Sequence, residues 1–190
     1  MKIPDVVTHR YDPRVGVCPN ICSLPDVEAS RVLDSLRREL RPNLKLNYLA
    51  RRRDTENWLL HAAATALRRQ LDQLPAYFFL GDFSHMADPS RPASLQLPVS
   101  SLRPDAVTFT PGDSMTVIQH ETRKIYTLNE VISLFAAGDA VAEFGLTDRH
   151  SFQKRFMRCS YGTARSKVYR MLHSHSRHDP GAYAHDLCLH

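Results

Sequence analysis

Hydrophobic residues recur at helical spacing in two early segments of the chain. In the first segment, apolar side chains follow one another every one to four positions: Ala29, Val32, Leu33, Leu36 and Leu40. This spacing predicts an amphipathic helix over residues 24–40, with Ser23 as its N-cap. Residues 45–74 contain no Gly or Pro and are rich in Ala, Leu and Arg, so they are predicted to form a second, longer helix.

After Pro75 the pattern changes to short apolar runs and strict alternation, which is typical of strands. Strands are predicted at residues 77–80, 95–99, 107–109 and 124–126. Pro98 lacks a backbone N–H and indicates that its strand lies at a sheet edge. The first 22 residues are interrupted by prolines and a glycine, so this segment is predicted to be irregular.

The last third of the chain is predicted to be helical. Thr127 and Glu130 have capping-box spacing, so a helix is expected to begin there and to end at Gly138. Phe152, Phe156 and Cys159 indicate a further helix, and residues 163–172 a last one.

These elements together predict an α+β fold, with N-terminal helices packed on a small, mainly antiparallel sheet of three to five strands. Residues 1–138 would form this domain. Residues 139–172 would be a basic helical segment, either of the same domain or as an appendage. Residues 173–190 are polar and rich in histidine, which predicts a flexible tail.

Composition narrows the class of protein. Hydrophobic residues make up 43% and charged residues 24% of the chain, which indicates a globular protein. Neither a signal peptide nor a membrane span is recognised, so a cytoplasmic location with reduced thiols and no membrane partner is expected. Cys18 and Cys22 are spaced as C-x3-C, but a matching second pair is not evident, so no metal site is predicted.

The formal net charge is +5, and the excess is concentrated near the C-terminus. Between Asp148 and Asp179 no Asp or Glu interrupts a series of lysines and arginines. Such a cluster can bind phosphates by releasing counterions, or it can be a solvated helical face. The candidate nucleic-acid-binding residues are Arg149, Lys154, Arg155 and Arg158.

Part of this basic segment has the order of a known DNA-binding motif. Gly145-Leu146-Thr147-Asp148 is followed by Phe152-Gln153-Lys154-Arg155-Phe156 and then by Gly162-Thr163. This order resembles the second helix-turn-helix of the arabinose-regulator (AraC-type) family, and the resemblance implies contact with the DNA major groove. The segment departs from the family in lacking the proline after the second glycine and in its longer spacing to that glycine.

A second resemblance covers about residues 8–135. It is carried by the strings THRYDP, NICSLP, EASRVLDSLR, YLARRRDTENWL, YFFLGDF, DPSRPASLQLPVSSL, VTFTPGDSM and IYTLNEV. Together they resemble a family of uncharacterised bacterial proteins. The resemblance implies a shared fold and carries no established activity.

The same strings place polar side chains at the ends of predicted elements, where binding sites are usually built. Carboxylates and an imidazole could transfer protons, and the candidate catalytic residues are His9, Glu56, Asp82 and Asp113. Guanidinium and ring side chains could hold an anionic ligand, and the candidate ligand-binding residues are Tyr11, Arg51, Arg52, Arg53 and His85. These side chains are expected to meet in one cavity that holds a nucleotide or NAD.

Three functions are compatible with this sequence. The first is a small enzyme of the toxin or effector type that resembles an ADP-ribosyltransferase or a ribonuclease at the level of fold. The second is a nucleic-acid-binding protein that uses the basic residues 147–170. The third is a binding module without catalysis.

Overall fold

The structure is a computed structural model. It describes residues 2–14, 17, 20–86, 88–121, 123–144 and 158–161, the last four and residue 141 by their backbone alone. Six strands form one sheet in the order β3-β1-β2-β6-β4-β5, and each neighbouring pair is antiparallel. The strands are β1 (Val6–Tyr11), β2 (Ala76–Leu80), β3 (Ala93–Pro98), β4 (Val107–Thr110), β5 (Tyr126–Thr127) and β6 (Arg158–Tyr161). The predicted α+β fold with an antiparallel sheet is confirmed.

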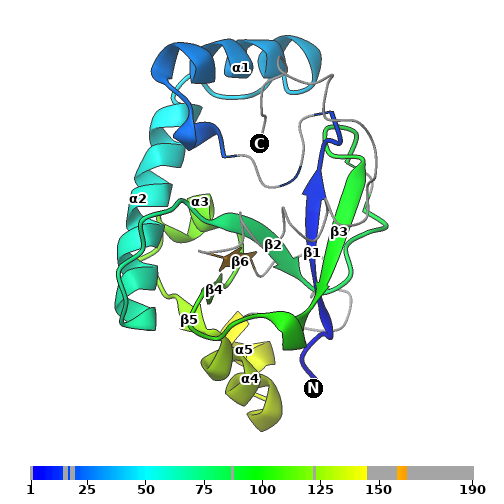
Figure 1. Ribbon diagram of the computed structural model, residues 1–190, viewed down its shortest axis with the longest axis vertical. Helices are drawn as coiled ribbons and strands as arrows, with labels where there is room; N and C mark the ends of the chain where they lie inside the picture. Colours follow the sequence, from blue (N-terminus) through cyan, green and yellow to red (C-terminus); the bar gives the residue numbers. More distant parts are fainter. Residues whose placement is uncertain are drawn as a thin grey trace, which may run out of the picture.

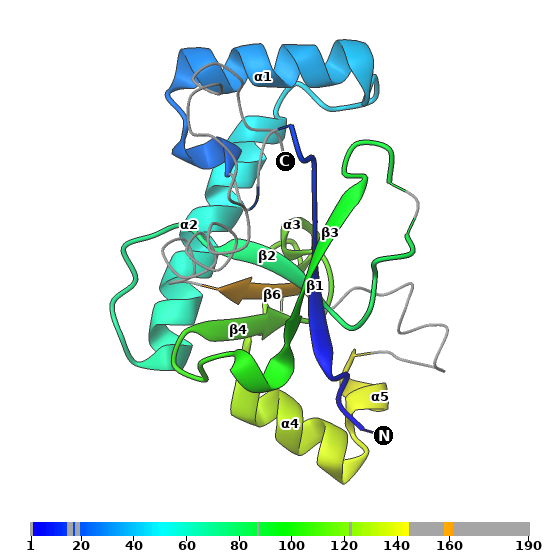
Figure 2. The same ribbon diagram turned by 45° about the vertical axis from the view of Figure 1, so that its right-hand side comes forward.

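The helices lie at the two ends and along one side of the sheet. They are α1 (Asp26–Glu39), α2 (Tyr48–Leu67), α3 (Ser114–Val117), α4 (Leu128–Ala137) and α5 (Ala140–Phe144), with short 3-10 turns at Ile21–Ser23 and Val99–Ser101. Figures 1 and 2 show α1 across one end of the molecule and α4 and α5 at the opposite end. The long helix α2 descends from the α1 end beside the sheet, where it contacts α3, β4 and β5.

Two strands correct the sequence prediction. Residues 1–22 were predicted to be irregular, but β1 pairs with both β3 and β2. Cys159 was predicted on a helix, but in β6 it pairs with Phe78 of β2 and Phe109 of β4. Both strands lie between two others, so backbone hydrogen bonds to neighbours that are distant in sequence decide their conformation. The sheet therefore has six strands rather than three to five.

The apolar side chains form two separate cores. The larger core packs one part of the sheet against α4 and α5, and it contains Val7, Phe78, Phe109, Val131 and Phe135. The smaller core joins α1 to the turn before it and to the start of α2, and it contains Ile21, Ala29, Val32, Leu33 and Leu36. Among the described residues, no helix has the length and apolar character that crossing a membrane requires.

The predicted boundaries of the helices are accurate for α4 and less so for α2. Gly138 ends α4 with a φ of 85°, as its position after the apolar run indicated. Arg68 ends α2 with a left-handed φ of 52°, so the helix stops before residue 74. The capping box of α4 is formed: the Thr127 hydroxyl accepts from Glu130 N–H, and the Glu130 carboxylate accepts from Thr127 N–H at 2.7 Å.

Removing this capping box is expected to weaken the fold by a small, measurable amount. Replacing Thr127 with Ala leaves the backbone N–H of Glu130 without its side-chain acceptor, so the free energy of unfolding should fall by about 1 kcal/mol. Urea denaturation followed by circular dichroism measures this change. Thr127→Ser keeps the hydroxyl and is the matched control. Equal midpoints for the Ala and Ser variants would show that the cap does not stabilise the protein.

Candidate ligand-binding site

A cavity of about 180 Å³ lies where β1 and β2 face the first turns of α2. Its wall also includes the start of α3 and four connecting segments, which lie before the first 3-10 turn, after α1, before β2 and before β3. Most of the polar residues in its lining are arginines or have aromatic rings. The polar lining residues are His9, Arg10, Asn20, Arg41, Tyr48, Arg52, Tyr77, Arg91 and Asp113. The cavity thus gathers side chains from segments that are far apart in sequence.

His9 on β1 forms part of the buried lining. Its side chain is held by a hydrogen bond of 2.7 Å between Nδ1 and the carbonyl of Tyr77, and by stacking on Tyr11 at 6.0 Å. A carbonyl only accepts, so Nδ1 carries the proton in the neutral ring. Burial lowers the pKa of His9 to about 4, because the raising effect of the Tyr77 carbonyl is outweighed by desolvation and by the charge of Arg91. At neutral pH the imidazole is therefore uncharged.

Arg52 on α2 is the second buried lining residue, and Glu56 one turn later balances its charge. The guanidinium Nη2 lies 2.8 Å from Glu56 Oε1, and the two side chains are 8% and 1% exposed. Burial opposes the charge of Arg52, but nearby Tyr77 and Glu56 outweigh it, so the pKa of Arg52 lies above its usual value. Asn20 donates to the same Glu56 oxygen at 3.1 Å. The pair is therefore charged, buried and fixed from two sides.

This buried pair leaves hydrogen-bonding capacity unused. The guanidinium of Arg52 lies over the ring of Tyr77, 4.3 Å from its centroid. Glu56 Oε2 is buried and has no hydrogen-bond partner within the part of the chain that the structure describes. A bidentate contact would have used both carboxylate oxygens, whereas the observed contact uses one.

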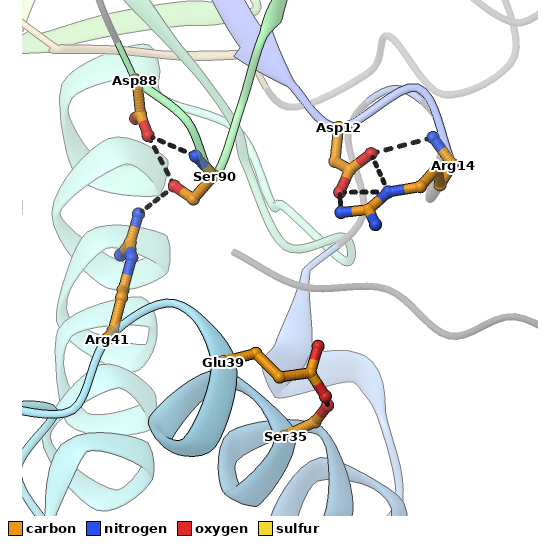
Figure 3. A network of polar contacts seen from close by, with 7 residues as sticks. All are labelled: Asp12, Arg14, Ser35, Glu39, Arg41, Asp88 and Ser90. Carbon is orange, nitrogen blue, oxygen red and sulfur yellow. Dashed lines mark hydrogen bonds and ion pairs between the residues drawn. The ribbon is translucent and has the colours of Figure 1, made fainter.

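A second polar network forms the more exposed side of the cavity. Arg41 donates to the Ser90 hydroxyl at 2.8 Å, and that hydroxyl donates to Asp88 at 2.6 Å (Figure 3). Asp88 also forms an ion pair of 2.6 Å with Arg91. Burial alone would raise the pKa of Asp88, but hydrogen bonds from Ser90 and the charge of Arg91 lower it. The network brings the segment after α1 to the segment before β3.

Arg10 fixes the loop that carries this network. Its guanidinium donates to the carbonyls of Ser84 at 2.8 Å and of Arg91 at 2.7 Å, with a longer bond to Phe83. The side chain is buried, and these carbonyls balance its charge through their dipoles. Arg10 is thus a structural residue that positions Arg91.

The charges around the cavity favour an anion. Arg10, Arg41, Arg52 and Arg91 line it, and the carboxylates that line it or pair with these arginines are Asp113, Glu56 and Asp88. Arg41 forms its hydrogen bond with a hydroxyl, and no ion pair of Arg41 is found among the described residues. Guanidinium groups bind carboxylates and phosphates through several N–H donors at once.

The structure brings some of the predicted site residues together. Of the candidate catalytic residues, His9 and Asp113 line the cavity and Glu56 lies behind Arg52. Asp113 is also the N-cap of α3, because its carboxylate accepts from Met115 N–H at 2.9 Å. Of the candidate ligand-binding residues, Arg52 lines the cavity, and Tyr11 contributes by stacking on His9.

Other predicted residues lie outside the cavity. Asp82 and His85 are exposed, and Asp82 accepts hydrogen bonds from Ser84 and Gln96. Arg53 pairs with Asp26 at 2.7 Å, and Arg51 is not part of the lining. Successive residues of a helix are rotated by about 100°, so one arginine of the three consecutive ones faces the cavity and the other two cannot.

Several lining residues were missed in the sequence. Arg41, Arg91 and Asn20 lie in connecting segments, where hydrophobic periodicity gives no indication of direction. Each of the three stands directly beside a proline, which indicates a bend in the chain but does not indicate a binding site. Tyr77 was predicted on a strand, but nothing in the sequence placed its ring against Arg52.

The candidate nucleic-acid-binding residues are not placed by the structure. Arg149, Lys154 and Arg155 lie outside the described residues, and of Arg158 only the backbone in β6 is described. Comparisons with known proteins give no further guide: no protein-family model, no curated protein and no solved structure matches this chain. Both resemblances noted in the sequence stay predictions.

Proposed function

We propose that this protein binds a small ligand that carries a phosphate or carboxylate group, with a nucleotide-type molecule as the best fit. One observation carries the proposal: Arg41, Arg52 and Arg91, from three different segments of the chain, converge with aromatic side chains on one cavity. Guanidinium groups supply the contacts for the anion, and the rings of Tyr48 and Tyr77 supply flat surfaces for a base.

The size of the cavity limits the ligand. A volume of about 180 Å³ is smaller than the roughly 300–1,000 Å³ of pockets that enclose a drug-sized molecule. A mononucleotide with part of its length in solvent suits this space better than a whole NAD molecule. Nucleotides are abundant in the cytoplasm, and a cytoplasmic location is part of the proposal.

The geometry supports binding more strongly than catalysis. With a pKa of about 4, His9 is a weak base at neutral pH, whereas an efficient general base has a pKa near the working pH. Glu56 is engaged by Arg52 and Asn20, and Asp82 lies on the surface. We therefore prefer the binding module to the predicted ADP-ribosyltransferase-like or ribonuclease-like enzyme.

Thermal unfolding in the presence of candidate ligands tests this function. The panel contains inorganic phosphate, nucleoside monophosphates, NAD and small aromatic carboxylates. A ligand at 100 times its Kd should stabilise the protein by about 2.7 kcal/mol and raise Tm. In Arg41→Ala the same ligand should bind at least tenfold more weakly, because the exposed side of the cavity loses a cation that has no ion pair among the described residues.

Arg38→Ala is the matched control, because Arg38 is an exposed arginine near the end of the neighbouring α1. This variant should retain the full rise in Tm. A panel in which no anion raises Tm, or a rise that Arg41→Ala leaves intact, would contradict the proposed function.

A further inference from the structure

The two ends of the cavity differ in charge. We call the buried part formed by His9 and Arg52 the inner end, and the more exposed part formed by Arg41 and Arg91 the outer end. At the inner end the charge of Arg52 is balanced by Glu56 at 2.8 Å, and the imidazole of His9 is neutral. Arg10 is buried as well, and its guanidinium is held by the carbonyls of Phe83, Ser84 and Arg91. The buried charges of the inner end are therefore already compensated, and desolvating a phosphate there would be unfavourable.

The inner end nevertheless offers hydrogen-bond donors. A guanidinium has five N–H groups. Within the described residues, the one acceptor that Arg52 contacts is Glu56, and the face of its guanidinium lies on Tyr77. Arg52 lines the cavity, so its N–H groups could donate to a neutral acceptor there, such as the carbonyl oxygen of a heteroaromatic ring.

The outer end carries the excess positive charge. Arg91 is paired with Asp88, but Arg41 donates to the uncharged hydroxyl of Ser90. Arg41 is half-buried, so an anionic group that it binds keeps part of its hydration. A phosphate is thus more stable at the outer end than at the inner end.

The volume sets the size of the ring. An apolar cavity of about 150 Å³ holds one benzene molecule. The cavity found here, about 180 Å³, is therefore suited to one six-membered ring with small substituents. The aromatic ring of Tyr77 in its wall can contact such a ring.

We propose that the site binds a pyrimidine-nucleotide-type ligand in one orientation, with the neutral ring at the inner end against Arg52 and Tyr77 and the phosphate at the outer end against Arg41. This inference rests on the proposed function. It adds the class of ring and the direction in which the ligand lies.

Calorimetric titration of the full chain tests the orientation with the two halves of the ligand. The probes are uridine 5′-monophosphate, uridine, ribose 5-phosphate and adenosine 5′-monophosphate. The pyrimidine nucleotide should bind at least tenfold more tightly than the other three. Arg41→Ala should reduce nucleotide affinity to that of uridine and should leave uridine binding unchanged.

A second variant tests the contribution of the inner end to binding and leaves no unpaired charge buried in the protein. Arg52→Met combined with Glu56→Leu removes both charges together. It should abolish uridine binding and retain the binding of ribose 5-phosphate.

Ribose 5-phosphate binding as tightly as the nucleotide, or equal affinities for the purine and pyrimidine nucleotides, would overturn the inference. So would a double variant that retains uridine binding. If ribose 5-phosphate binds as tightly as the nucleotide and Arg41→Ala weakens its binding, that result would still support the proposed function. If no anion binds and Arg41→Ala has no effect, the proposed function fails as well.

Discussion

Replacing Glu56 with Ala is expected to reduce the free energy of unfolding by about 3–5 kcal/mol, the range found when one partner of a buried ion pair is removed. Glu56 is 1% exposed, and its partner Arg52 is 8% exposed. After the substitution the guanidinium stays buried without its counterion, and Asn20 loses an acceptor at 3.1 Å. Urea denaturation at pH 7 measures the change.

The double variant Arg52→Met, Glu56→Leu distinguishes a buried unpaired charge from a general loss of packing. Removing both charges removes both desolvation penalties, so the double variant should lose much less stability than the two single variants together. Arg53→Ala on the same helix is the matched control. Its ion pair with Asp26 is largely exposed on the aspartate side, at 83%, so the loss should be at most about 1 kcal/mol. Strictly additive effects in the double variant would contradict this account.

Elements with a local signal could be predicted from the sequence. The apolar spacing of α1 and the capping box of α4 depend on residues within one or two turns, and both helices form where they were expected. The predicted N-cap of α1 is wrong: Pro25 occupies that position, and Ser23 belongs to the 3-10 turn before it. β2 and β4 were recognised because a buried strand shows as a short apolar run. The local signal in β1 was present in its β-branched Val6, Val7 and Thr8, but the surrounding prolines favoured an irregular segment.

The site depends on contacts that no local pattern contains. Arg52 could be proposed because it is one of three consecutive arginines, but its selection over Arg51 and Arg53 follows from the rotation of α2 against β2. Arg91 reaches the cavity because Arg10 binds its carbonyl, 81 residues away along the chain. The sequence therefore predicts which residue types bind an anion, whereas the fold decides which of them meet.

Acidification is expected to destabilise this protein through His9. Its ordinary pKa is 6.5 and its pKa in the fold is about 4, because burial and the charge of Arg91 disfavour the imidazolium. The unfolded chain therefore binds a proton between these two values that the folded chain does not. The stability that His9 contributes is complete above pH 6.5 and is lost as the pH falls to 4, by about 3 kcal/mol in total.

The carboxylates of the protein also titrate in part of this window, so the test compares the wild type with His9→Asn. Asn can still donate to the carbonyl of Tyr77 and does not titrate, and the contribution of the other groups cancels in the difference. The variant should be less stable at pH 7, and the difference from the wild type should shrink as the pH falls, because the variant has no imidazole to protonate. Urea midpoints at pH 7, 6, 5 and 4 measure this convergence. Parallel curves for the two proteins would mean that the fold tolerates a charged His9, and the imidazole could then no longer be described as neutral at the inner end of the cavity.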